Sequence, residues 1–191
     1  MNKTKRNIWI AVGVVVAVIV IYSISSYNSL AKSNQDVKSQ ASQVENVMNR
    51  RYDLIPNLVN SVKGSMKQEK DVFGDIAKAR QNYSNASSTA KKADASAQLD
   101  QSVGTLINVI REDYPELNSN KNVSTLMTQL EGSENRIATE RKRYNEKVSD
   151  FNKSVVTFPK NIFANMYGFH QKEYFKASDK AKENPKVDFN N

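Results

Sequence analysis

The residues best suited to chemistry are the charged side chains of the stretch RRYDLIPNLVNSVKG, which begins at Arg50. Its Asp53, together with Glu134 much later in the chain, could form a carboxylate pair for general acid–base catalysis. The chain has no cysteine and only one histidine, His170, which is expected to be a packing or surface residue rather than a metal ligand. Arg50 and Arg51 would more simply neutralise the two carboxylates. We therefore expect no catalytic residues, no metal site and no cofactor.

The composition favours helices over sheets. The chain has only six glycines and four prolines, and its β-branched and aromatic residues do not alternate at period two over any long stretch. We therefore predict an all-α fold. The formal net charge of +8 favours anionic lipid or cell-wall polymer over nucleic acid, because no basic patch is interleaved with stacking aromatics. The alternative is that this charge only keeps the surface soluble.

Residues 8–24 read IWIAVGVVVAVIVIYSI and contain no charged side chain. A helix that crosses a bilayer needs about 17–25 predominantly apolar residues. Trp9 and Tyr22 lie near opposite ends of the run, where interfacial aromatics are favoured. The sequence therefore predicts a transmembrane anchor that contacts the lipid bilayer, preceded by a basic tail at residues 1–7.

The charges that flank residues 8–24 suggest an orientation in the plasma membrane. Three basic residues precede the segment, whereas Lys32 and Lys38 follow it. This small excess places the N-terminus in the cytoplasm and the rest of the chain outside. The alternative is a cleaved signal peptide, since Ser-Leu-Ala at 29–31 resembles a cleavage site.

Beyond the anchor, apolar residues recur in alternating steps of three and four, which is a heptad seam. One seam runs from Tyr27 to Val62, and another runs through a predicted helix at 122–156. Shorter helices are expected at about 68–86 and from Leu99 to a stop before Pro115. The Ser- and Ala-rich residues 84–98 between them are expected to be a connection or a weakly held helix end. The two long seams should bury each other, giving a long antiparallel bundle over residues 25–157.

Charged residues interrupt both seams. Arg51 lies in the first seam, and Glu134 and Arg141 lie in the second. Antiparallel alignment places Arg51 opposite Glu134, and a buried arginine needs a partner of this kind. Pro56 removes one backbone hydrogen bond and predicts a bend nearby. We therefore predict a mid-bundle polar layer that sets helix register or, alternatively, binds a partner. Its candidate residues are Arg50, Arg51, Asp53, Pro56, Asn57, Glu134, Asn135 and Arg141.

Residues 158–191 form a tail rich in aromatic side chains. We expect this tail to pack on the bundle, with Gly168 permitting a turn. The alternative is an exposed aromatic surface that contacts a partner or the membrane. The candidate residues of this surface are Phe163, Tyr167, Phe169, Tyr174 and Phe175.

Several stretches of the sequence are distinctive in combination: YNSL, RRYDLIPNLVNSVKG, QEK, LEGSENRIATERKRYNE, FPKNIF and PKVDF. Together these stretches resemble the LemA family. The resemblance covers nearly all of the chain after the anchor, although residues 84–97 are unusually rich in serine and alanine. It implies a bacterial-type, single-span membrane protein with a long antiparallel helical body and no established enzymatic activity. It also implies a link with membrane organisation, with membrane proteases or TPM-domain proteins as conceivable partners.

These observations lead to one expected function and one alternative. We expect a membrane-anchored interaction or scaffold protein of the bacterial envelope, which binds an unidentified membrane or envelope protein and is not an enzyme. The alternative is a protein that binds anionic lipid or cell wall and takes part in membrane organisation.

Overall fold

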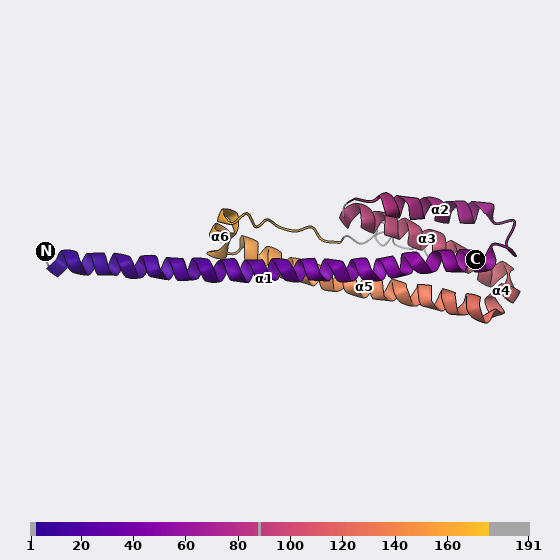
Figure 1. Cartoon of the computed structure of the whole chain (residues 1–191), viewed down its shortest axis with the longest axis horizontal. Coiled ribbons are helices and arrows are strands. Elements are labelled where there is room, and N and C mark those ends of the chain that lie inside the picture. The colour runs from indigo at the N-terminus through magenta and orange to yellow at the C-terminus, as the bar shows by residue number, and fades with distance from the viewer. Residues whose placement is uncertain (1–2, 88, 176–191) are drawn as a thin grey trace, which may run out of the picture. The chain divides into compact units, whose positions relative to one another are not determined.

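The computed structural model describes residues 3–87 and 89–175, and within these ranges it contains six helices and no strand (Figure 1). The predicted all-α fold is therefore confirmed. In chain order the helices are α1 (Lys3–Val62), α2 (Lys70–Asn85), α3 (Thr89–Asp113), α4 (Pro115–Ser119), α5 (Lys121–Val156) and α6 (Lys160–Met166).

The helices contribute to two compact units. Among the described residues, unit 1 comprises 3–42 and 143–174, and unit 2 comprises 43–87, 89–142 and 175. Both α1 and α5 are long enough to contribute one part to each unit.

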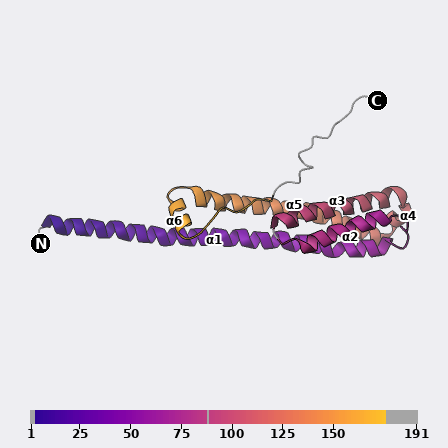
Figure 2. The same ribbon diagram turned by 90° about the horizontal axis from the view of Figure 1, so that it is seen from above.

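Unit 2 is held together by apolar seams from four helices. Ile55, Leu58 and Val62 of α1 are buried at the predicted spacing of three and four residues. Figure 2 shows α2 and α3 side by side, and these two helices pack on each other in the same unit. The core cluster of this unit also contains Met66, Ile76, Ala79, Leu99, Val103, Leu106, Ile107, Ile110, Val123, Met127 and Leu130.

The Ser- and Ala-rich stretch at 84–98 is mostly helical and does not form a long connection. Helix α3 already begins at Thr89, so most of the stretch is helical. Ala95 and Ser96 are buried, because their small side chains let α3 approach its neighbours closely. Lys92 forms an ion pair with Glu45 of α1.

The turn before α5 has a recognisable cap. The Asn120 side-chain Oδ1 accepts hydrogen bonds from the backbone nitrogens of Asn122 (3.0 Å) and Val123 (3.4 Å). These nitrogens lie in the first turn, where a helix leaves its N–H groups without backbone partners. Asn120 therefore caps the N-terminus of α5. Pro115 begins the short helix α4.

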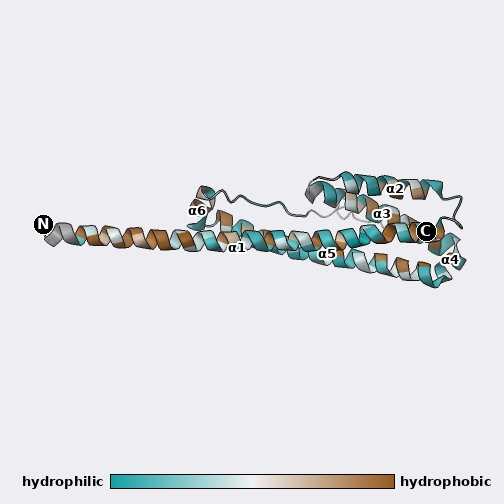
Figure 3. Cartoon of the chain, viewed as in Figure 1, coloured by the Kyte–Doolittle hydropathy of each residue, from teal (hydrophilic) through white to brown (hydrophobic). Residues whose placement is uncertain are grey.

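Unit 1 combines an apolar helix segment with a packed end. Among the described residues, α1 is the one helix long and apolar enough to cross a membrane by length and composition. Figure 3 shows hydrophobic residues on its N-terminal part, followed by mixed hydropathy. Farther along α1, Leu30 and Val37 are buried, as are Val148 and Phe151 of α5.

The segment after α6 is tied to α5. Gly168 adopts a positive φ of 73°, which glycine tolerates without strain, and the chain turns there as predicted. Asn152 of α5 then exchanges two hydrogen bonds with the backbone of Lys172, at 2.7 and 2.9 Å. The Tyr144 hydroxyl donates to the Glu173 carbonyl at 3.3 Å. Side chains of α5 thus satisfy backbone groups of a segment that has no regular structure.

Replacement of Leu130 by alanine tests the core of unit 2. Leu130 is fully buried, so the Leu130→Ala variant should lose about 2–5 kcal/mol of unfolding free energy in chemical denaturation. The matched control is Leu126→Ala in the same helix, because Leu126 is only partly buried against the same cluster. Equal losses in the two variants would contradict the assignment of Leu130 to the core.

Candidate functional site

The candidate site is a buried cluster of charged residues around Arg51 in unit 2. Arg51 occupies a seam position of α1 and is only 4% exposed. Its Nε atom lies 3.0 Å from Oδ1 of Asp100 in α3, and its Nη1 atom lies 3.8 Å from Oε2 of Glu134 in α5. The predicted approach of Arg51 to Glu134 is therefore present. Asp100 is the closer and more buried counter-charge, with a side chain 20% exposed against 63% for Glu134.

A second arginine, Arg141 of α5, lies close enough to the same cluster to interact electrostatically with Asp100 and Arg51. Arg141 is half-buried, and burial is the main cause that lowers its pKa, with the positive charge of Arg51 adding to the effect. The negative charge of Asp100 acts in the opposite direction. The Arg141 guanidinium also lies 5.7 Å from the ring centroid of Phe175, within the range of a cation–π contact. Two arginines on different helices thus act on the charge of Asp100, and Arg51 is the one in ion-pair contact with it.

The ionised form of Asp100 is less favourable than that of an exposed aspartate. Burial raises its pKa above the ordinary value of 3.8, and this effect exceeds the opposing attraction of Arg51 and Arg141. The repulsion from Glu134 raises the pKa further. Desolvation of the Asp100 carboxylate therefore exceeds its attraction to the two arginines, as is common for ion pairs shielded from water.

An aromatic layer joins α1 to α2 beside the charges. Tyr83 stacks on Tyr52 with ring centroids 5.2 Å apart, and the Arg80 guanidinium lies 4.3 Å from the Tyr52 centroid. The Tyr83 hydroxyl donates a hydrogen bond to Oδ1 of Asn49 at 3.2 Å. Burial, reinforced by the negative charge of Glu45, raises the pKa of Tyr83 to about 12. Tyr83 is therefore a neutral hydrogen-bond donor at physiological pH.

The ion pairs of Arg51 are suited to positioning α1 against α3 and α5. The carboxylates nearest to Arg51 are engaged with it, and both of its partners come from other helices. A one-residue slip of α1 would remove a buried charge from its counter-charge, which is costly. Within residues 3–87 and 89–175, no three His, Cys, Asp or Glu side chains gather as metal ligands would.

Only some residues of the predicted mid-bundle polar layer lie near Arg51 in the structure. Arg50, Asp53, Asn57 and Asn135 are exposed, because neighbouring positions on a helix point in different directions. The carboxylate that joins Glu134 around Arg51 is Asp100, so the suggested pairing of Asp53 with Glu134 is wrong. Pro56 is partly buried, and α1 continues through it to Val62.

The assignment of Glu134 to the buried seam is also wrong. Ser133 is buried in its place, and its hydroxyl donates to the Leu130 carbonyl at 2.6 Å. A small hydroxyl that is satisfied by its own helix can be buried at much lower cost than a carboxylate. The longer Glu134 side chain reaches Arg51 from the edge of the interface.

The aromatic residues predicted as a tail surface divide into two groups. Phe163 and Phe169 are half-buried and Phe175 is buried, whereas Tyr167 and Tyr174 are 37% and 48% exposed. Neither interpretation, complete packing or a fully exposed surface, describes all five. The remainder of the tail, including PKVDF, lies outside the described residues.

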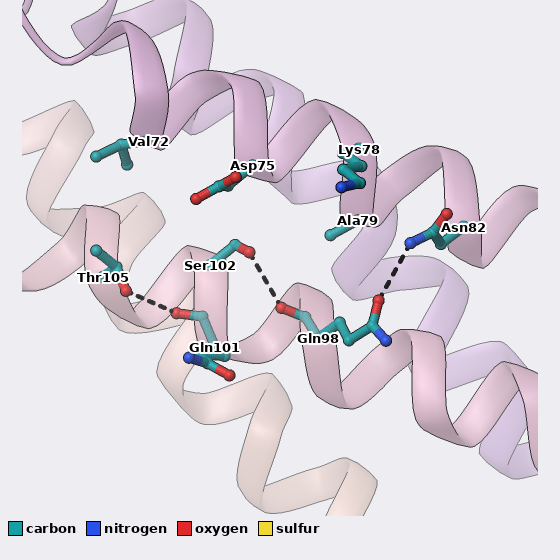
Figure 4. Close-up of a pocket in the computed structure, with 9 residues that line it drawn as sticks. All are labelled: Val72, Asp75, Lys78, Ala79, Asn82, Gln98, Gln101, Ser102 and Thr105. Carbon is teal, nitrogen blue, oxygen red and sulfur yellow. Dashed lines mark hydrogen bonds between the residues drawn. The ribbon is translucent and has the colours of Figure 1, made fainter.

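A small groove lies between α2 and α3, with a volume of about 270 Å³ (Figure 4). The Asn82 side chain donates a hydrogen bond to the Gln98 side chain across it, at 3.1 Å. Amides, hydroxyls and two opposite charges dominate its wall, so it favours polar contacts. Its lining residues are Val72, Asp75, Lys78, Ala79, Asn82, Gln98, Gln101, Ser102 and Thr105.

Together, the fold and the site define a class: a helical-bundle protein with one candidate membrane-spanning helix and a buried charged cluster between its helices. The LemA family model matches residues 40–189, so the chain belongs to the LemA family. The resemblance inferred from the sequence is thereby confirmed.

Three magnetosome proteins are similar to this chain. MamQ 1 and MamQ 2 of Paramagnetospirillum magneticum are each 27% identical to it over 175 residues. MamQ of Magnetospirillum gryphiswaldense is 23% identical over the same length. Each match covers 78% of this chain and 64% of the relative, so the chain spans less than two thirds of the length of these relatives.

The raised pKa of Asp100 predicts a specific effect of pH. The folded state binds the Asp100 proton more tightly than the unfolded chain does, so the contribution of Asp100 to stability falls as pH rises from 3.8 through its folded-state pKa. The Asp100→Asn variant has no proton to lose. Its unfolding free energy, compared with that of the wild type at each pH, should therefore increase across this window and then reach a plateau.

The matched control for this comparison is Leu126→Ala, which removes packing from the same unit without changing a titratable group. Its difference from the wild type should vary much less with pH. If instead the wild type gained stability relative to Asp100→Asn as pH rose, the attraction of the arginines would outweigh burial, contrary to this account.

Proposed function

We propose that this LemA-family chain is a membrane-anchored helical-bundle protein of the bacterial envelope that acts by binding another membrane or envelope protein, and not by catalysis. The observation that carries the proposal is the dual composition of α1. The helix contains an exposed apolar segment, and farther along it contributes the buried seam of the bundle. The same helix would therefore both anchor the protein and build its binding domain.

The pairing of charges in unit 2 supports binding over catalysis. General acid–base catalysis needs a titratable group that can reach a substrate in the right protonation state. Asp100 and Glu134 instead face Arg51, and the Tyr83 hydroxyl is bonded to Asn49. These interactions hold helices together and leave the polar outer helix faces, with the groove between α2 and α3, for contact with a partner.

We also propose that the chain resides in the plasma membrane, with its N-terminus in the cytoplasm and the bundle outside. The excess of basic residues before residue 8 supports this orientation. Retention of the apolar segment as an anchor, and not its cleavage, is part of the proposal.

The net charge of +8 favours a second candidate function, in which the bundle binds anionic lipid or cell-wall polymer. Binding of this kind depends on many exposed charges and weakens as salt screens them. A packed protein–protein interface depends less on ionic strength, because its central contacts are desolvated.

Photo-crosslinking in native membranes tests the two candidates. A photoreactive residue is placed at exposed Asp53, Asp75 or Asn135 of the full chain, on α1, α2 and α5 respectively. A protein partner predicts an adduct of one defined mass, formed from some positions but not from others, at both low and high salt. Samples without irradiation are the control.

The complementary measurement uses the full chain in discs of zwitterionic lipid. Co-sedimentation of these discs with vesicles containing anionic lipid should be weak at every ionic strength if the first candidate is correct. Strong co-sedimentation that falls steeply with salt, together with no protein adduct from any position, would contradict the proposed function and favour the second candidate.

A further inference from the structure

Helix α6 in unit 1 exposes a row of large apolar side chains. Phe158, just before the helix, is 75% exposed, and Ile162 and Met166 are 56% and 63% exposed. Ile162 and Met166 are four residues apart within α6, so they lie on the same side of the helix, and Phe158 adds an exposed ring in the turn before it. Contiguous apolar surface of this kind usually marks a contact site.

A neighbouring side of α6, with the residue that follows it, packs against α1 at the end of the apolar segment. The rings of Phe163 and Tyr22 are 5.6 Å apart, and those of Tyr167 and Tyr27 are 5.1 Å apart. The Tyr167 hydroxyl also forms a hydrogen bond with the Ser23 hydroxyl. Ala164 between them is fully buried. Helix α6 is therefore fixed beside residues 22–27 of α1.

The length of the apolar segment places this contact at a definite depth. At ~1.5 Å per residue, residues 8–24 extend about 25 Å. The hydrocarbon core of a bilayer is about 30 Å thick, so residues 22–27 would lie near its boundary with the headgroups. Tyrosine is favoured at this boundary. The contacts of Tyr22 and Tyr27 would carry α6 to the same level.

The position of Lys160, the first residue of α6, is consistent with a helix that lies at the boundary between hydrocarbon and headgroups. The Lys160 Nζ atom donates a hydrogen bond to Oγ of Ser29, at 3.0 Å. Ser29 lies beyond Tyr27 and therefore farther from the hydrocarbon core. A lysine can keep its ammonium group among headgroups while the apolar residues of the same helix face the acyl chains.

We propose that α6 is an interfacial membrane element, which lies along the bilayer that α1 crosses and turns Phe158, Ile162 and Met166 toward the lipid. The occupant of this apolar row is thus the acyl region of the bilayer. The row lies beside the apolar segment of α1, which exposes large apolar side chains as far as Ile24 and contacts Phe163 through Tyr22. The inference rests on the anchoring of α1, which is part of the proposed function, and does not depend on the partner.

Spin labels on single cysteines test the proposal in the full chain, which has no cysteine of its own. Ile162→Cys and Met166→Cys are labelled, and the protein is reconstituted in vesicles of phosphatidylethanolamine and phosphatidylglycerol. Collision rates with oxygen and with a water-soluble nickel chelate report immersion depth. Both labels should lie about 5–10 Å below the headgroup level, as is typical of interfacial helices.

Two controls make the outcomes distinguishable. Val18→Cys reports the apolar segment, and Glu146→Cys reports an exposed position of α5. If the Val18 label lies in lipid but the Ile162 label contacts the chelate as freely as the Glu146 label, the inference about α6 is wrong and the anchor stands. A label at Ile162 shielded from both reagents would show a protein occupant and would also overturn the inference. Contact of the Val18 label with the chelate would contradict the anchor itself.

Discussion

The structure depends on how α1 buries its apolar residues, because that helix contributes to both units. Its first part is apolar on all sides, which is stable where the surroundings are themselves apolar. From Leu30 onward the apolar residues follow one stripe, which requires a partner helix on one side and water on the other. The change from one pattern to the other determines where an anchor can end and where packing with α5 begins.

Arg51 adds a second constraint inside unit 2. Its place in the stripe puts a guanidinium where the neighbouring positions are filled by Met48 and Ile55. The helices that pack there must therefore supply carboxylates, and α3 supplies Asp100 while α5 supplies Glu134. Burial raises the pKa of Asp100 despite two nearby arginines, and an ion pair of this kind is weak evidence for added stability. Specifying which residues face one another is the role that fits its geometry.

Much of the helical fold and part of the cluster around Arg51 could be predicted from the sequence, since the spacing of apolar residues reveals which face of a helix is buried. The seams of α1 and α5 gave the antiparallel register and the approach of Arg51 to Glu134. Asp100 was missed because spacing within one helix does not show how α3 is rotated against α1. The available signal was its place next to buried Leu99. The exposed positions of Arg50 and Asp53 show that closeness in sequence to a buried charge does not imply membership of its cluster.

The central claim is that one continuous helix changes from a lipid-facing anchor to a bundle helix. A scan of single spin labels along residues 8–62, in the full chain reconstituted in vesicles, tests it directly. We expect high oxygen accessibility at every position of 8–21 and protection at Tyr22 and Ser23, where α6 packs. Beyond them we expect a repeat of three and four residues with protected positions at Leu30, Val37 and Val44. Contact with a water-soluble reagent throughout 8–24, or the absence of any periodicity after Leu30, would contradict it.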